Sequence, residues 1–237
     1  MCDYEGVFSG MNGVIFYSNT GQSKAIAEYF AKELAYPLLD MEKNATAEYK
    51  NLVLVFPVYC QNIPDLVKTF LDKVRVGNLT LIATYGKMCP GNVLYEIQHK
   101  YPHKIVAAAY IPTKHTYVED DEVFCDFDGL ISVVEKIKNP AIVALPKLYK
   151  NPLADIFPRW RSSAGLRLRK NSHCNGCNIC AENCSFQAIH FGVTNGKCIR
   201  CLRCVKNCPK GALDVKIGLP LRLYLRKKKR DELIIYI

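Results

Sequence analysis

The chain has 237 residues, 49% hydrophobic and 23% charged, which are values of an ordinary globular protein and exclude a disordered or collagen-like chain. No apolar run approaches the roughly 18 residues of a membrane-spanning helix. The acidic first residues lack the basic region of a secretory signal. We therefore expect a cytoplasmic protein with about two domains.

Charge is distributed unevenly along the chain. Residues 1–150 carry 15 Lys and Arg against 17 Asp and Glu, a net of −2, whereas residues 151–237 carry 17 against 5, a net of +12. A basic segment of this kind is typical of contact with nucleic acid, an anionic membrane or an acidic protein.

Short apolar runs alternate with amphipathic stretches in the first 140 residues. Runs that are apolar almost throughout are typical of parallel strands buried on both faces. The five predicted strands are residues 14–17, 37–39, 52–56, 79–83 and 105–110. Helices are predicted between them, one with Ile26, Phe30 and Leu34 on its buried face and others over 65–74, 92–100 and 130–138. The alternation predicts an α/β domain with a doubly wound, five-stranded parallel sheet.

The first predicted strand leads into a loop of small and hydroxyl-bearing residues that precedes a helix. Backbone N–H groups at such a helix N-terminus bind an anion, and the helix dipole favours negative charge there. The lysine of an ATP-binding loop and the three glycines of a dinucleotide loop are both absent, so the phosphate of a mononucleotide fits best. The alternative is a capping turn without a ligand. The loop residues are Ser18, Asn19, Thr20, Gly21, Gln22 and Ser23.

This loop resembles the Ser/Thr-x-Thr-Gly-x-Ser/Thr phosphate loop of the flavodoxin family, which binds FMN. Ser18, Thr20, Gly21 and Ser23 match the pattern. The resemblance implies that residues 57–63 and 84–92 surround the isoalloxazine ring, because ligands of open α/β sheets lie at the carboxyl ends of the strands.

Several residues of these two loops are candidates to contact the flavin. Tyr59 and Tyr85 either stack on the ring or are half-buried surface aromatics. Gly86 would allow close approach of the backbone, and Cys60 and Cys89 are expected to be small apolar fillers. The predicted flavin contacts in the two loops are Pro57, Tyr59, Cys60, Thr84, Tyr85 and Gly86.

Eight of the twelve cysteines lie between Cys174 and Cys208, in two copies of Cys-x2-Cys-x2-Cys-x3-Cys that are 24 residues apart. Three thiolates at this spacing wrap a 4Fe-4S cluster, and the fourth cysteine of each copy binds the other cluster. Zinc is the alternative, although the displaced fourth cysteine is unusual for a zinc site. The spacing predicts one cluster on Cys174, Cys177, Cys180 and Cys208, and a second on Cys198, Cys201, Cys204 and Cys184.

The cysteine-rich segment resembles a bacterial ferredoxin with two 4Fe-4S clusters, except that Ser185 stands where the family often has proline. Together, the two resemblances are to flavodoxin–ferredoxin fusion proteins of anaerobic microbes. The predicted parts are a flavodoxin-like FMN domain over 1–138, a proline-punctuated connector over 139–171, a small α+β ferredoxin-like domain over 172–217 and a basic tail over 218–237.

Clusters of charged residues have two interpretations each. Basic residues beside the cysteines either offset the negative charge of the clusters or are ordinary surface charge. The acidic patch within 119–128 is either a solvated loop or a docking surface. The basic tail is either solvated or bound to anionic lipid or RNA.

These features predict an electron-transfer protein that contains FMN and two 4Fe-4S clusters and exchanges electrons with an external redox protein. No nucleic-acid partner is expected, and contact of the tail with an anionic surface would be weak. No catalytic acid or base is predicted. The alternatives are an FMN-dependent reductase of a small substrate such as a quinone, and a redox-sensing or nucleic-acid-binding module that uses the tail.

Overall fold

The computed structural model describes residues 10–43, 48–118, 122–155, 164–227 and 229–237. The N-terminal segment, for which the sequence predicts no secretory signal, lies outside this part. So do Cys2, Glu119, Asp120, Asp121 and Lys228. None of the described helices is long and apolar enough to cross a membrane.

The chain folds into two compact units. Unit 1 comprises Met1–His115, Asp121–Asn151 and Arg230–Ile237, and unit 2 comprises Thr116–Asp120 and Pro152–Lys229. The C-terminal residues therefore belong to unit 1, and the larger part of unit 2 is inserted between two segments of unit 1.

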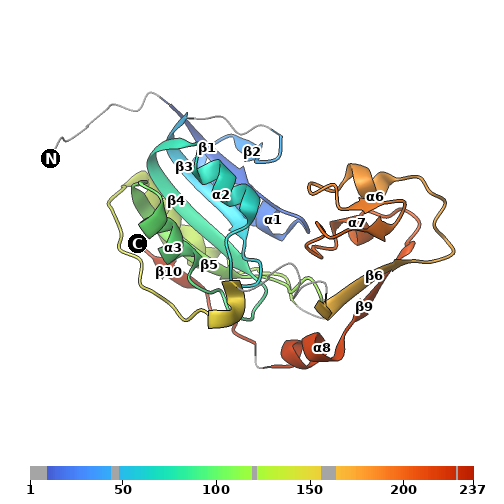
Figure 1. Cartoon of the computed structure of the whole chain (residues 1–237). Helices are drawn as coiled ribbons and strands as arrows, with labels where there is room; N and C mark the ends of the chain where they lie inside the picture. The colour runs from blue at the N-terminus through green and yellow to red at the C-terminus, as the bar shows by residue number, and fades with distance from the viewer. Residues whose placement is uncertain (1–9, 44–47, 119–121, 156–163, 228) are drawn as a thin grey trace. The chain divides into compact units, whose positions relative to one another are not determined.

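Unit 1 is built on a six-stranded sheet, five strands of which are parallel (Figure 1). The parallel strands lie in the order β2-β1-β3-β4-β5, which is the order of flavodoxin-like doubly wound sheets. This confirms the predicted α/β fold with five parallel strands. The strands are β1 (Met11–Phe16), β2 (Leu38–Asp40), β3 (Glu48–Pro57), β4 (Arg75–Tyr85) and β5 (Ile105–Pro112).

Helices cover both faces of this sheet. On one face lie α2 (Asp65–Leu71) and α3 (Val93–Lys100), and on the other lie α1 (Gln22–Leu34) and α4 (Ile131–Lys138), which follows the short 3-10 helix η1 (Asp128–Leu130). Successive strand residues face opposite sides, so Leu54 joins the first core cluster and Val55 the second. Burial on both faces explains why the strands read as continuous apolar runs.

β3 and β4 begin several residues before their apolar runs, at a row of asparagines that crosses three strands. Asn78 Nδ2 donates to Asn51 Oδ1 at 2.8 Å, and Asn51 Nδ2 donates to Asn12 Oδ1 at 2.9 Å. Because these amides satisfy one another, polar side chains are accommodated at this end of the sheet.

The sixth strand, β10 (Ile234–Tyr236), was not predicted from the sequence. It pairs antiparallel with β5, with Ile235 opposite Ala109. The edge of a sheet offers unpaired backbone groups, and the apolar C-terminal residues cover that edge. The end of the predicted basic tail is thus a strand of unit 1.

The residues predicted as a connector are divided between the two units. Val143 and Leu145 are buried against unit 1, where Val143 N donates to Ile105 O at 3.0 Å and Leu145 N donates to Gln98 Oε1 at 2.8 Å. The last residues of the predicted connector form β6 (Leu166–Lys170) of unit 2. The described connector is therefore attached to both units at particular residues and is not a separate linker.

Unit 2 is a small α+β arrangement with little apolar core. β6 pairs antiparallel with β9 (Leu213–Ile217), and β7 (Ile189–His190) pairs with β8 (Val193–Thr194). The helical turns are η2 (Pro152–Asp155), α6 (Ile179–Glu182), α7 (Arg203–Lys206) and α8 (Leu219–Leu225). Its buried core cluster consists of Ile189, Cys204 and Leu213. A core this small is typical of domains that depend on a metal for stability.

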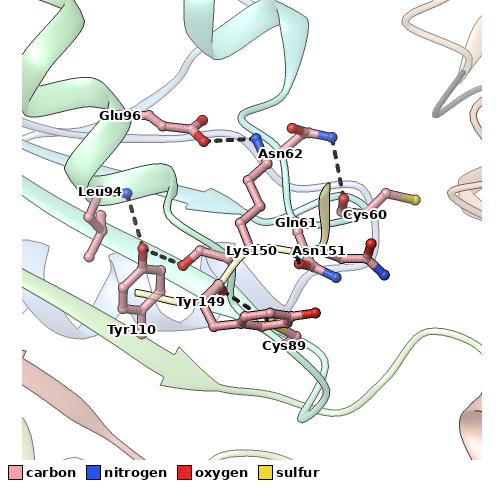
Figure 2. Close-up of polar contacts among 11 residues, drawn as sticks. Cys60, Gln61, Asn62, Cys89, Leu94, Glu96, Tyr110, Tyr149, Lys150 and Asn151 are labelled. Atoms are coloured by element: carbon pink, nitrogen blue, oxygen red, sulfur yellow. Dashed lines mark hydrogen bonds and ion pairs between the residues drawn. The ribbon is translucent and has the colours of Figure 1, made fainter. Parts of the chain in front are cut away.

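We predict that the Tyr110→Phe substitution destabilises unit 1 by about 1–3 kcal/mol. The Tyr110 hydroxyl is buried, donates to Gly91 O at 3.2 Å and accepts a bond from Leu94 N at 3.1 Å, so the substitution removes both hydrogen bonds (Figure 2). The control is Tyr149→Phe, at a residue that is 65% exposed, and its free energy of unfolding is expected to change by no more than about 0.5 kcal/mol. Urea unfolding measures both, and equal stability of the two variants would contradict this account.

Candidate functional site

The loop after β1 enters helix α1 through a left-handed glycine. Gly21, at the N-cap of α1, has a φ of 91° that favours glycine. Its N–H donates to Ser18 Oγ at 3.1 Å. Among the described residues, no side-chain hydrogen bond is found at the N-cap of α1, and the first turn carries no acid. Thr20 and Gln22 are partly exposed beside these amides. An uncapped helix N-terminus of this kind is suited to binding an anion.

Side-chain hydrogen bonds join this loop to the carboxyl ends of β3 and β4. Asn19 Nδ2 donates to the Tyr17 hydroxyl at 2.9 Å and to the Tyr59 hydroxyl. The buried hydroxyls of Ser23 and Thr84 lie 2.9 Å apart. The structure therefore brings the predicted phosphate loop, Tyr59 and Thr84 together, although the Ser23 hydroxyl is bonded to Thr84.

The segment after β3 is a tight turn with two left-handed residues. β3 ends at Pro57, and Asn62 N then donates to Tyr59 O at 2.8 Å. Between them, Cys60 and Gln61 have φ values of 50° and 66°. Positive φ at both central positions defines a type I′ turn, which usually contains Asn or Gly. Cys60 is exposed within this turn, so the expectation that it is an apolar filler is wrong.

Tyr85 does not lie where a flavin could stack on it. The residue is 3% exposed, and its ring packs edge to face on Tyr110, with 6.5 Å between ring centroids. Its hydroxyl donates to Glu232 O at 2.6 Å. Next to it, a Cβ on Gly86 would lie 2.7 Å from His115 Cδ2, so the small residue accommodates the histidine.

The four cysteines of the first predicted set line one cavity. Cys174, Cys177, Cys180 and Cys208 contribute to its wall, together with Gly176, Phe191 and Gly192. In the described part of the chain, no three His, Cys, Asp or Glu side chains are grouped to hold a single metal ion. The first motif and the last cysteine of the second motif thus meet at a common cavity.

The backbone around the cysteines repeats with the 24-residue period. Asn171 N donates to Ala212 O at 3.0 Å, and Asn195 N donates to Ala188 O at 2.9 Å. These contacts are crosswise, because the start of each motif is bonded to the residues that follow the last cysteine of the other.

The repeat extends to conformations and side chains. Left-handed φ values recur at equivalent positions, 74° at Gly176 and 61° at Arg200. Asn207 Nδ2 also donates to its counterpart Asn183 at 3.3 Å. Unit 2 is therefore a pair of similar halves, as the sequence repeat predicts.

Comparisons with known proteins agree with this organisation. Residues 192–214 match the model of the 4Fe-4S binding domain. The chain joins a flavodoxin-like domain to a 4Fe-4S ferredoxin domain. The flavodoxin-like domain is unit 1, and the ferredoxin domain lies within unit 2.

More distant similarities were also found. An uncharacterized protein of Methanocaldococcus jannaschii is 27% identical over 177 residues, which cover 63% of this chain and 71% of the relative. A flavodoxin from the domain Archaea is 14% identical over 54% of this chain and 99% of its own, with a TM-score of 0.41. An NAD(P)H:quinone oxidoreductase from Methanothermobacter marburgensis is 12% identical over 55% of this chain and 96% of its own, with a TM-score of 0.34. These structural scores are low, and the assignment of the fold rests on the strand order.

In the ferredoxin domain, the cysteines of the second predicted set are close enough to influence one another. Burial raises the pKa of Cys204 to about 12, with further contributions from Cys201, Cys198 and Cys184. Burial also raises the pKa of Cys201 to about 11, against the opposing influence of Arg203. Thiols in such surroundings keep their protons unless a metal replaces them.

Backbone amides point at the last cysteine of each motif. Ala188 N donates to Cys184 Sγ and Ala212 N donates to Cys208 Sγ, both at 3.3 Å. Hydrogen bonds to the sulfurs are one of the means by which a protein tunes the reduction potential of an iron–sulfur cluster. Ser185, at the position of the family's proline, accepts a bond from Arg203 Nη1 at 2.6 Å.

Sequence reasoning missed the residues that fix the carboxyl-edge loops of the flavodoxin-like domain. Lys87 is buried and lies 3.2 Å from Asp231 of the C-terminal segment. Gln61 Oε1 accepts a bond from Asn151 N at 2.8 Å. The one available signal was the apolar run 233–237, which is suited to an additional strand.

We predict that the free energy of unfolding falls as pH rises above about 10. Burial raises the pKa of Tyr85 to about 12 and raises that of Tyr110 further, so the folded state holds these protons more tightly than the unfolded chain does. The contribution of these protons to the free energy of unfolding is complete below the ordinary tyrosine pKa of 10.0 and is lost as pH rises towards the raised pKa of about 12. Thermal unfolding of wild type and Tyr85→Phe between pH 8 and 11 measures it. The variant is expected to show the shallower decline, and equal slopes would contradict the prediction.

Proposed function

We propose that this protein transfers electrons between FMN bound to its flavodoxin-like domain and two 4Fe-4S clusters bound to its ferredoxin domain, and exchanges them with an external redox protein. The proposal rests on one observation above all. An uncapped helix N-terminus at the carboxyl edge of a flavodoxin-like sheet occurs in the same chain as two crosswise cysteine motifs, one of which overlaps the 4Fe-4S match.

The loop over residues 18–23 is proposed to hold the FMN phosphate. Gly21 is exposed, and the first amides of the 13-residue helix α1 have neither a capping side chain nor an acid beside them. The positive end of the helix dipole would favour the phosphate dianion at this place. Gly21 itself has no side chain that could stand between these amides and a ligand.

The remainder of the FMN is proposed to extend towards Tyr59. Asn19 Oδ1 is buried and has no hydrogen-bond partner, so it is an acceptor that a ribityl hydroxyl would satisfy. Tyr59 is half-buried, and its ring meets Tyr17 edge to face at 6.3 Å between centroids. It remains the candidate for contact with the isoalloxazine ring, whereas the burial of Tyr85 removes that residue from the proposal.

Two ligand sets are proposed for the clusters, each with three cysteines of one motif and the last of the other. The common cavity supports the set of Cys174, Cys177, Cys180 and Cys208. The mutual influence on thiol pKa supports the set of Cys198, Cys201, Cys204 and Cys184. The crosswise backbone bonds described above support both.

The chain's own residues would position these groups and set their electrostatic surroundings. When bound, FMN supplies a two-electron carrier and each cluster a one-electron carrier. Arg203 is near enough to Cys201 to lower its pKa, so this cation would offset negative charge at a cluster. The exposed Lys197, Lys206 and Lys210 favour an acidic protein as the external partner.

The crosswise ligand sets predict an unusual result for double variants. Replacing Cys174 and Cys208 together by serine removes ligands of one proposed cluster, so half of the iron and sulfide is expected to remain. Replacing Cys198 and Cys208 together affects both clusters and is expected to remove nearly all of it. Iron and sulfide analysis after oxygen-free purification measures both. The opposite ranking would show that each motif binds its own cluster.

Electron exchange tests the function itself. Light-driven reduction through the flavin is expected to bleach the cluster absorbance at a rate independent of protein concentration, because both sites are on one chain. The matched control is Ser18→Asp, which keeps an acceptor for Gly21 N but opposes the phosphate. It should bind FMN about tenfold more weakly or worse, retain its affinity for riboflavin, and keep its iron. Clusters that stay oxidised beside reduced flavin in the wild type would refute the proposal.

A further inference from the structure

The end of the connector is fastened to the carboxyl-edge loops of the flavodoxin-like domain (Figure 2). Cys89 Sγ donates to Tyr149 O at 3.6 Å, Lys150 Nζ lies 2.7 Å from Glu96 Oε1, and Asn151 N donates to Gln61 Oε1 at 2.8 Å. The Lys150 side chain is only 12% exposed. We call residues 149–151 with these contacts the connector clamp.

The C-terminal segment is fastened to the same edge. Arg230 N donates to Lys87 O at 2.7 Å, and Lys87 Nζ lies 3.2 Å from Asp231 Oδ2. The bond from Tyr85 to Glu232 O follows, and then β10 pairs with β5. We call residues 230–236 with these contacts the C-terminal clamp.

The connector clamp contacts the turn after β3, the C-terminal clamp contacts the loop after β4, and these two loops contact each other. A Cβ on Gly91, in the loop after β4, would lie 2.7 Å from Gln61 O in the turn after β3. Gly91 also has a φ of 67°, so this close approach depends on glycine. Gln61 belongs to the connector clamp, and Lys87, four residues before Gly91, belongs to the C-terminal clamp.

Residues 152–229 of unit 2 begin directly after one clamp and end directly before the other. We propose that Asp231 and β10 are positioning elements: the C-terminal clamp fastens the second end of the cluster-bearing segment to the loops that hold the flavin, and rapid electron exchange depends on it. This inference rests on the proposed function.

The physical reason is confinement. Each further attachment reduces the volume that a tethered segment samples, so fastening the second end of residues 152–229 to the edge that holds the first end raises the effective concentration of the segment at that edge. The Lys87 side chain is only 7% exposed, so water would solvate its ammonium group poorly if Asp231 moved away. The ion pair therefore favours the fastened state of the C-terminal segment. By linkage, a flavin that orders these loops also strengthens the clamps.

Three variants test this on the full chain with its cofactors. Asp231→Asn removes the carboxylate that faces Lys87, and Ile235→Pro removes an N–H from β10. The control is Glu135→Gln, the same change in the exposed pair with Lys138, which lie 3.8 Å apart. With FMN added to saturation, exchange between flavin and clusters is expected to slow about tenfold in both clamp variants, with iron content unchanged. The control and the conservative Asp231→Glu should keep the wild-type rate.

The outcomes separate the two proposals. Absence of exchange in the wild type refutes the proposed function. Exchange in the wild type together with wild-type rates in both clamp variants refutes the role of the C-terminal clamp and leaves the function intact.

A second measurement does not depend on electron transfer. Hydrogen exchange of the β10 amides is expected to be severalfold slower when FMN is added to the flavin-free protein, because the flavin and the clamp stabilise the same loops. Asp231→Asn should remove this slowing and Glu135→Gln should not. Equal protection of the β10 amides with and without FMN in the wild type would contradict the coupling between flavin binding and the C-terminal clamp. This comparison needs no variant, so it remains decisive if a clamp variant loses its cofactors.

Discussion

The flavodoxin-like domain depends on a parallel sheet that is buried on both faces. Because α1, α2, α3 and α4 occupy those faces, the strands can present polar chemistry only at their ends. Parallel strands bring their carboxyl ends to one edge, so the loops after β1, β3 and β4 meet there although they are far apart in sequence. The bonds of Asn19 to Tyr59 and of Ser23 to Thr84 then fix these loops relative to one another.

The ferredoxin domain follows a different principle. Its one core cluster among the described residues contains three buried residues, so apolar burial contributes less to its stability than in the flavodoxin-like domain. Its order comes from two similar halves that exchange backbone hydrogen bonds crosswise, at Asn171 and at Asn195. Cys208 of the second motif lines one cavity with Cys174, Cys177 and Cys180 of the first, as the proposed crosswise ligand sets require.

The C-terminal strand β10 returns the chain from the second unit to the first. A protein with a flavodoxin-like domain followed by a ferredoxin domain needs only one connection between them. Here the chain returns to the first unit, covers the β5 edge and places Asp231 beside a buried lysine. The cluster-bearing segment is therefore an insertion held at both ends, and the loops that hold those ends are the ones proposed for the flavin.

The sequence by itself determined the local features: the five apolar strands, the glycine that opens α1 and the cysteine spacing. Each of these depends on a few neighbouring residues, so pattern and spacing suffice to predict it. Only the tertiary structure decided the positions of Tyr85, Cys60 and β10. Tyr85 and Cys60 both stand at strand ends beside polar loops, yet the C-terminal segment buries one and a left-handed turn exposes the other. Partners 147 residues apart, such as Tyr85 and Glu232, leave no local pattern, because only packing of the whole chain brings them together.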